Sequence, residues 1–303
     1  MSVFSSPVQT AEIVTRLRAA GCVFAEDEAE LLVSTASTPE ALAAMVARRV
    51  AGVPLEHVLG WAEFCGLRVV VEPGVFVPRP RTEFLVRRAV ALACAAGGSP
   101  VVLDLCCGTG AMGAALIAGL GGTGGDGAEG SGAGEGGARG GGVGRNGAGE
   151  GGIGGDGAQG GRAELHAADL DPVAVRCARR NLPGAHVYEG DLFEPLPSSL
   201  RGRVGLLIVS PPYVPSGSIG LLPSEARLHE PLMALDGGGD GLDVARRVIA
   251  EAPQWLAPGG HLLIETSERQ AEATAAAVAG AGLRARAERS EELDATAVIG
   301  TRS

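Results

Sequence analysis

The chain has 303 residues, of which 46% are hydrophobic and 20% charged, and its formal net charge is -10. This length predicts two domains with a sizeable core, and the acidic balance argues against duplex nucleic acid as the main partner, because neutralising phosphates needs a basic face. With no apolar run of about 18 residues and no signal pattern at the N-terminus, we expect a cytoplasmic protein that does not enter a membrane. The six cysteines form no Cys-x-x-Cys pair and the histidines are scattered, which predicts no metal site and no disulfide framework.

Residues 1–75 predict a small helical domain that ends in a β-hairpin arm. Between residues 8 and 50, apolar side chains recur three and four positions apart, as in amphipathic helices. Thr38 followed by Pro39 has the composition of a helix start. Residues 68–72 (Arg-Val-Val-Val-Glu) alternate in polarity, which is typical of a hairpin strand.

A stiff segment opens the second domain, which we place at residues 76–303. In residues 78–83 (Pro-Arg-Pro-Arg-Thr-Glu) two prolines bracket an arginine and fix an extended backbone. Thr82 can cap the helix that is predicted from Glu83 to Ala95. One interpretation is a rigid linker between domains; the other is a segment that crosses the sheet edge and lines a pocket.

Residues 100–110 predict a strand and a tight turn, followed by an Ala-rich helix to Leu120. Glycines let a ligand approach the backbone, and the free N–H groups of the helix start point at it. Asp104 at the strand end would repel a pyrophosphate but could receive a cationic amino acid, which favours a sulfonium such as S-adenosylmethionine. The candidate ligand-binding residues of this stretch are Asp104, Cys106, Cys107, Gly108, Thr109 and Gly110.

Residues 121–161 interrupt the pattern. They hold 23 of the 49 glycines, and such a segment cannot bury enough apolar area to offset the entropy of ordering it. We therefore predict a disordered insertion that lies away from the site.

The next two strands are predicted at residues 163–169 and 185–188. Asp171 before a proline is a helix cap. Asp169 has no comparable structural explanation, so we assign it to the hydroxyls of a ribose. After the second of these strands, Asp191 could bond an adenine amine while Leu192 flanks the ring.

A fourth strand at residues 204–209 ends in Ser210, Pro211, Pro212 and Tyr213. A proline pair stops the strand and fixes an extended turn at the carboxyl edge of the sheet, where α/β proteins bind ligands. A planar amine-bearing group could stack on Tyr213 and donate its N–H bonds to Ser210 and to the Pro211 carbonyl. The alternative is a solvent turn with a buried tyrosine.

The rest of the chain continues the alternation. A long loop at residues 214–241 is of a length that usually serves function, and a helix at 243–256, a strand at 261–266 and a helix at 269–281 follow. Two short strands near 285–288 and 295–299 close the chain. This order predicts an α/β fold with a seven-stranded Rossmann-like sheet of the class I methyltransferase type.

Together these segments resemble the release-factor glutamine methyltransferase family (PrmC/HemK). The motifs that carry the resemblance are residues 54–60 with Phe64, residues 78–80 with Thr82 and Glu83, residues 104–110, Asp169, and residues 230–231, 234–235 and 239–242. The resemblance implies S-adenosyl-L-methionine as methyl donor and methylation of the side-chain amide nitrogen (N5) of a protein glutamine. In the best-known case this glutamine belongs to the Gly-Gly-Gln loop of peptide-chain release factors.

The chain departs from the family at two places. Ser210 stands where the family usually has Asn before Pro-Pro-Tyr, and Cys106 and Cys107 stand in a loop that is usually richer in Gly and Thr. A hydroxyl rotates, whereas an Asn carbonyl has a fixed acceptor direction. We therefore expect a divergent relative or paralogue with weaker activity on glutamine or a shifted acceptor.

Two other functions stay open from the sequence. The Ser-Pro-Pro-Tyr motif also resembles that of DNA amino-methyltransferases acting on cytosine N4 or adenine N6, although the acidic charge and the absence of a basic base-reading region argue against them. The divergent turn and Ser210 would also suit a non-catalytic module that binds S-adenosylmethionine or a partner.

Overall fold

The computed structural model describes residues 7–121 and 163–303. The predicted Gly-rich insertion therefore lies, apart from Gly121, outside the described residues. Within the described ranges no helix is long and apolar enough to cross a membrane.

The N-terminal helices pack around a core of their own. Its buried side chains include Leu17, Leu32 and Val46. Thr38 caps α3 as predicted, because its hydroxyl oxygen accepts a hydrogen bond from the Ala41 N–H at 3.1 Å. The helices are α1 (Pro7–Ala19), α2 (Ala25–Thr35), α3 (Pro39–Val50) and α4 (Leu55–Leu59).

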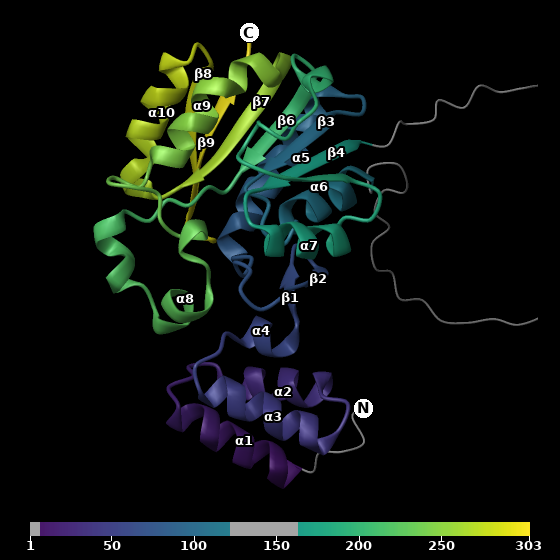
Figure 1. Ribbon diagram of the computed structural model, residues 1–303, viewed down its shortest axis with the longest axis vertical. Helices are drawn as coiled ribbons and strands as arrows, with labels where there is room; N and C mark the ends of the chain where they lie inside the picture. The colour runs from purple at the N-terminus through teal and green to yellow at the C-terminus, as the bar shows by residue number, and fades with distance from the viewer. Residues whose placement is uncertain (1–6, 122–162) are drawn as a thin grey trace, which may run out of the picture.

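The predicted hairpin arm is also present. Strands β1 (Trp61–Phe64) and β2 (Leu67–Val70) pair antiparallel and lie between the N-terminal helices and the large sheet (Figure 1). The arm is fixed to the larger body because the Val70 N–H donates to the Asn181 side chain at 2.8 Å.

Seven strands of the described residues form one sheet in the order β5-β4-β3-β6-β7-β9-β8. The first five are parallel, and β9 runs antiparallel between β7 and β8. This confirms the predicted fold class. The strands are β3 (Val101–Leu105), β4 (Glu164–Asp169), β5 (His186–Glu189), β6 (Val204–Val209), β7 (Leu256–Thr266), β8 (Arg284–Ser290) and β9 (Ala295–Thr301).

Alternate residues of the central strands pack into two hydrophobic cores, one on each face of the sheet. Val102 and Leu206 pack with one set of helices, whereas Leu103 and Leu207 pack with the other. Both faces are covered, which is why these strands are apolar throughout. The first face carries α5 (Glu83–Ala96), α6 (Ala111–Gly121) and α7 (Pro172–Asn181); the second carries α9 (Asp243–Trp255) and α10 (Ala271–Gly280).

The segment between β6 and α9 is more ordered than a plain loop. It holds α8 (Ser224–His229) between the short helices η4 (Ser216–Leu221) and η5 (Leu232–Ala234). Figure 1 shows it standing beside the carboxyl edge of the sheet and above the N-terminal helices.

One local prediction is wrong. Thr82 does not cap α5 through its side chain, because its backbone is already helical (φ -66°, ψ -17°). Its hydroxyl instead donates to Glu265 on β7 at 2.7 Å. A tertiary contact has taken the place of the local cap.

Candidate active site

A cavity of about 670 Å³ opens at the carboxyl edge of the sheet. This volume is in the range of small-molecule sites. It brings together the turn after β3, the ends of β4 and β6, and the segment after β5. The candidate residues in its wall are Cys106, Cys107, Gly108, Thr109, Asp169, Asp191, Leu192, Ser210, Pro211, Pro212 and Tyr213.

Two candidate residues, Asp104 and Gly110, are not in the wall. Gly110 packs on α7, where an added Cβ would lie 2.8 Å from Leu182. Asp104 is fully buried beneath the turn; its Oδ2 accepts from the Gly113 N–H at 3.0 Å, and its Oδ1 has no partner among the described residues. Burial raises the pKa of Asp104 to about 8. The structure therefore places Asp104 as a support of the α6 start, and its contact with a cationic ligand stays a prediction.

The turn is fixed by Asp169. The Gly108 N–H donates to its Oδ2 at 2.8 Å and the Asp171 N–H to its Oδ1 at 2.9 Å. Asp169 thus has a structural role that the sequence did not reveal. Each oxygen keeps capacity for another donor, and the side chain lies in the cavity wall, so the residue still suits ribose hydroxyls.

Asp191 is paired in a way that the sequence could not predict. The Arg247 guanidinium on α9 donates to its Oδ2 at 2.7 Å. Both residues lie in the cavity wall beside Leu192. A carboxylate, a fork of N–H donors and an apolar side chain are groups that suit the edge and face of an adenine, so this part of the cavity fits the adenosine part of S-adenosylmethionine.

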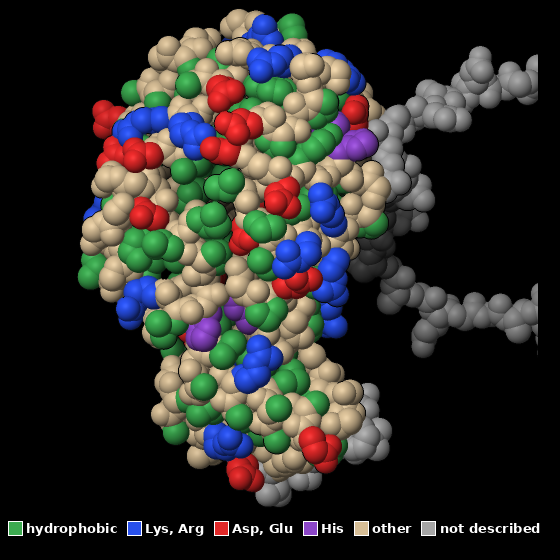
Figure 2. All heavy atoms as spheres, viewed as in Figure 1, with side chains coloured by type: hydrophobic (Ala, Val, Ile, Leu, Met, Phe, Trp, Pro, Cys, Tyr) green, Lys and Arg blue, Asp and Glu red, His purple; other side chains and the backbone are tan. Residues whose placement is uncertain are grey.

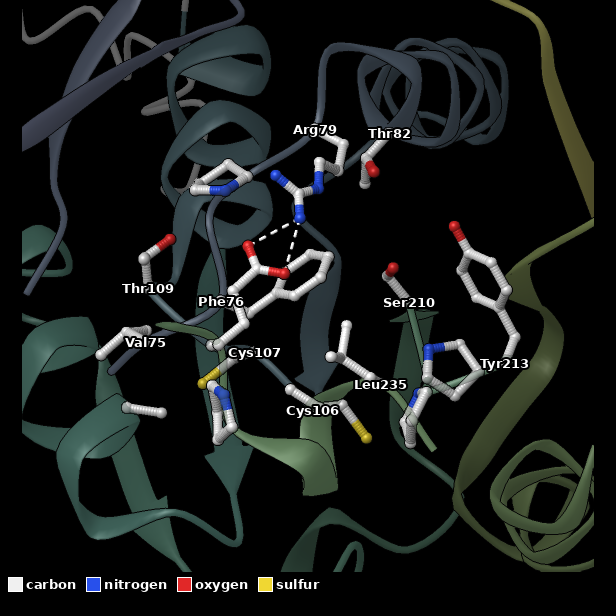
Figure 3. A pocket seen from close by; sticks show the side chains of 18 of the residues that line it. Val75, Phe76, Arg79, Thr82, Cys106, Cys107, Thr109, Ser210, Tyr213 and Leu235 are labelled. Carbon is white, nitrogen blue, oxygen red and sulfur yellow. Dashed lines mark hydrogen bonds and ion pairs between the residues drawn. The ribbon is translucent and has the colours of Figure 1, made fainter. Parts of the chain in front are cut away.

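The end of β6 forms the opposite side of the cavity. Figure 3 shows the hydroxyl groups of Ser210 and Tyr213 pointing toward the side of the site on which Thr82 lies, with Arg79 near Thr82 and Cys106 on the opposite side. The Arg81 guanidinium donates to the Tyr213 hydroxyl at 2.6 Å. Burial raises the pKa of Tyr213 above its ordinary value, so its hydroxyl stays protonated near neutral pH.

Glycines of the following segment hold this turn from behind. A Cβ on Gly241, whose φ is +80°, would lie 2.3 Å from the Tyr213 carbonyl oxygen, and one on Gly237 would lie 2.6 Å from that of Pro212. A backbone can approach these carbonyl oxygens this closely only where the approaching residue is a glycine, which carries no side chain. The Gly-rich motif at residues 237–241 therefore supports the Ser-Pro-Pro-Tyr turn, which we call the clamp.

The stiff segment does line the cavity. The Arg79 guanidinium donates to both carboxylate oxygens of Glu230 at 2.6 Å, and the Val77 N–H donates to the same side chain at 3.2 Å (Figure 3). Glu230 is almost completely buried. The pair ties the Pro-Arg-Pro segment to the segment that carries α8, two motifs that lie far apart in the sequence.

No model of a known protein family matches the chain, whereas individual relatives do. A release factor glutamine methyltransferase of Geobacter sulfurreducens is 36% identical over 241 residues, which cover 77% of this chain and 69% of that protein. One of Mycolicibacterium smegmatis is 34% identical over 257 residues, covering 82% and 76%. A 4-amino-L-phenylalanine/4-methylamino-L-phenylalanine methyltransferase of Streptomyces pristinaespiralis is 32% identical over 231 residues, covering 74% and 65%. On this similarity the chain belongs to the release factor glutamine methyltransferase family.

Proposed function

We propose that this chain methylates the N5 nitrogen of a protein glutamine, and that the glutamine is that of the Gly-Gly-Gln loop of a peptide-chain release factor. S-adenosyl-L-methionine, the methyl donor of the family, supplies an electrophilic methyl group on a sulfonium. The observation that carries the proposal is that one cavity is lined both by the turn after β3 and by the clamp after β6. A donor and an acceptor can therefore meet in it.

On the donor side, the residues that would hold the group are the backbone of the turn, Asp169 for the ribose, and Asp191 with Leu192 for the adenine. On the acceptor side, the Ser210 hydroxyl and the Pro211 carbonyl accept the two N–H bonds of the amide, and Tyr213 stacks on its plane.

An amide nitrogen is a poor nucleophile because its lone pair is delocalised. Two acceptors on its N–H bonds favour a pyramidal nitrogen and stabilise the positive charge that develops on it. The nitrogen lone pair forms the new N–C bond, the S–C bond pair returns to sulfur, and one N–H proton leaves to water. Positioning supplies much of the rate, so the chain needs no strong general base.

Exposed apolar side chains around the cavity mouth support a protein as acceptor. Leu221, Leu228, Leu232 and Met233 are 48 to 85% exposed, and all four lie on the segment that carries α8. Figure 2 shows apolar side chains on this side of the molecule, above the narrow waist that leads to the N-terminal helices. Clustered apolar surface beside a site is typical of protein contact; a free amino acid would not need it.

A second candidate is the amine of a free aromatic amino acid. Two observations favour it: the relative from Streptomyces pristinaespiralis bears that activity in its name, and Ser210 replaces the family's Asn. A primary aryl amine has two N–H bonds, so the Ser210 hydroxyl and the Pro211 carbonyl could hold it as well.

An acceptor panel tests the proposal. The purified chain is incubated with methyl-labelled S-adenosylmethionine and one acceptor at a time. The protein acceptors are a release factor and the same factor with alanine in place of its loop glutamine. The other two acceptors are 4-amino-L-phenylalanine and duplex DNA. We expect label in the intact release factor alone. Label in 4-amino-L-phenylalanine or in DNA alone would replace the proposal, and absence of S-adenosylmethionine binding by calorimetry would favour a non-catalytic module.

A further inference from the structure

Glu265 is a buried carboxylate behind the clamp to which the sequence assigned no role. It is the residue before the last of β7, and the parallel register pairs Val209 with Ile264, so the next residues, Ser210 and Glu265, emerge side by side at the carboxyl edge. The Glu265 side chain is 6% exposed. It is not in the cavity wall, whereas Ser210 is.

Two hydroxyls donate to one oxygen of this carboxylate. Ser210 Oγ lies 2.8 Å and Thr82 Oγ1 lies 2.7 Å from Glu265 Oε2. Its other oxygen, Oε1, lies 3.5 Å from Arg81 Nε, and Arg81 in turn holds the Tyr213 hydroxyl. Glu265 thus connects the clamp with the segment that crosses the sheet edge.

We propose that Glu265 is a positioning residue that fixes Ser210 as a hydrogen-bond acceptor toward the cavity; the inference rests on the proposed function. A serine hydroxyl has one proton and two lone pairs. Because the proton is given to Glu265, only lone pairs are left for a ligand. A hydrogen bond to a charged acceptor is shorter and stronger than a neutral one, and it polarises the hydroxyl so that its oxygen accepts more strongly.

This arrangement would compensate for Ser210 standing where the family usually has Asn. An Asn carbonyl has its acceptor direction by itself, whereas a serine hydroxyl gains one only from a partner that takes its proton. The two polar groups of the clamp that would hold the amide nitrogen, the Ser210 hydroxyl oxygen and the Pro211 carbonyl, are then both acceptors. This pair favours a nitrogen that brings two N–H bonds, as a primary amide or a primary aryl amine does, and it holds the monomethylated product by one bond fewer.

The test is a double-mutant cycle between Glu265→Met and Ser210→Ala, measured as methyl transfer to a purified release factor at saturating S-adenosylmethionine. Met fills a similar volume but cannot accept the proton. We expect Glu265→Met to lower kcat about tenfold or more in the parent, with the Kd for S-adenosylmethionine, measured by calorimetry, unchanged. In the Ser210→Ala background Glu265 has no Ser210 hydroxyl to orient, so we expect a much smaller fractional loss, which reflects only its contacts with Thr82 and Arg81.

Two further variants keep the test decisive. In Ser210→Asn the acceptor direction no longer depends on Glu265, so Glu265→Met should cost less there than in the parent. If Glu265→Met does not fold, Glu265→Gln replaces it in the cycle. Its amide oxygen still accepts the Ser210 proton, but as a weaker, uncharged acceptor, so we expect a smaller loss of kcat in the parent.

The outcomes separate the two proposals. Equal fractional losses of kcat in the parent and in the Ser210→Ala background would mean that Glu265 only supports the fold, and the inference would be wrong while the proposed function stands. A parent that binds S-adenosylmethionine but transfers nothing to the release factor would overturn the proposed function and this inference with it.

Discussion

Gly241 is the residue on which the geometry of the clamp depends most directly. Its φ is +80°, and a Cβ there would lie 2.3 Å from the Tyr213 carbonyl oxygen. We expect Gly241→Ala to lower the free energy of unfolding by about 2 kcal/mol or more, from the strained backbone and the collision together. Methyl transfer should fall by about tenfold or more, because the displaced turn carries Tyr213 with it. Urea unfolding and initial rates measure the two effects.

Gly239 offers a matched control in the same segment. An added Cβ at Gly239 would have no heavy atom within 4 Å. Gly239→Ala should therefore unfold at the midpoint of the parent and keep its activity. If both variants lose the same stability, the close approach at Gly241 is not the cause.

The buried carboxyl group of Asp104 predicts how the free energy of unfolding depends on pH. Burial raises its pKa to about 8, so the folded chain keeps a proton that the unfolded chain releases near pH 4. The contribution of protonated Asp104 to the free energy of unfolding is therefore fully present below about pH 4 and is lost as the pH rises toward 8. Asp104→Asn cannot ionise. We expect the free energy of unfolding of the donor-free parent to fall more steeply from about pH 5 to about pH 8 than that of the variant; parallel profiles would contradict this.

Among the contacts between elements, the ion pair of Arg79 and Glu230 joins two segments that line the cavity. The Glu230 side chain is only 1% exposed, so removing its partner leaves a buried carboxylate with one backbone donor. We expect Arg79→Met to cost about 3 kcal/mol in the free energy of unfolding. The exposed pair of Arg246 and Asp240 is the comparison, and Arg246→Met should change stability little. Similar urea midpoints for the two variants would show that the pair does not hold the segments together.

At the scale of elements, apolar periodicity was enough to predict most helices and strands and their order. Apolar periodicity failed where a tertiary contact determines the local structure. Thr82 has the composition of a cap, but its hydroxyl bonds Glu265. Residues 214–241 show no apolar periodicity, so α8, which is only six residues long, was not predicted. The last strands extend past their predicted ends because β8 and β9 pair along their full length.

The candidate site residues also divide into those whose place the sequence could predict and those whose place depends on a tertiary contact. The place in the cavity wall of those that directly follow or close a strand, such as Asp169 and Ser210, could be predicted, because the carboxyl ends of parallel strands meet at one edge. The places of Arg247 and Glu265 could not, since each is set by a contact with a residue of another element. A single signal existed for Glu265: an acid near the end of a predicted strand. This signal is informative only once β7 is known to lie next to β6 in the sheet.

For the whole molecule, the N-terminal helices meet the catalytic part through a buried charge. Arg49 on α3 donates to Glu28 on α2 at 2.6 Å and to Glu225 on α8 at 2.6 Å. The helices and the α8 segment are thus held together at one side of the cavity mouth. Leu221 and Leu228 lie on the same segment as Glu225 and are exposed, so they belong to the surface that the proposed protein acceptor would contact.

The apolar side chains give a prediction at this scale. The double variant Leu221→Ser, Leu228→Ser should raise the KM for a release factor by about tenfold, because a few buried apolar contacts carry much of the energy of a protein interface. Binding of S-adenosylmethionine by calorimetry should not change. An unaltered KM would mean that the acceptor does not touch this surface.

The proposed function requires that the clamp after β6 presents a glutamine amide to a methyl donor held at the turn after β3. Peptide mass spectrometry of a release factor detects this transfer, after incubation with S-adenosylmethionine and either the parent chain or Ser210→Ala. We expect one added methyl group on the glutamine of the Gly-Gly-Gln loop with the parent, and a strongly reduced fraction with Ser210→Ala. A parent that leaves this glutamine unmodified, or a Ser210→Ala variant that modifies it as fast, would contradict the proposed role of the clamp.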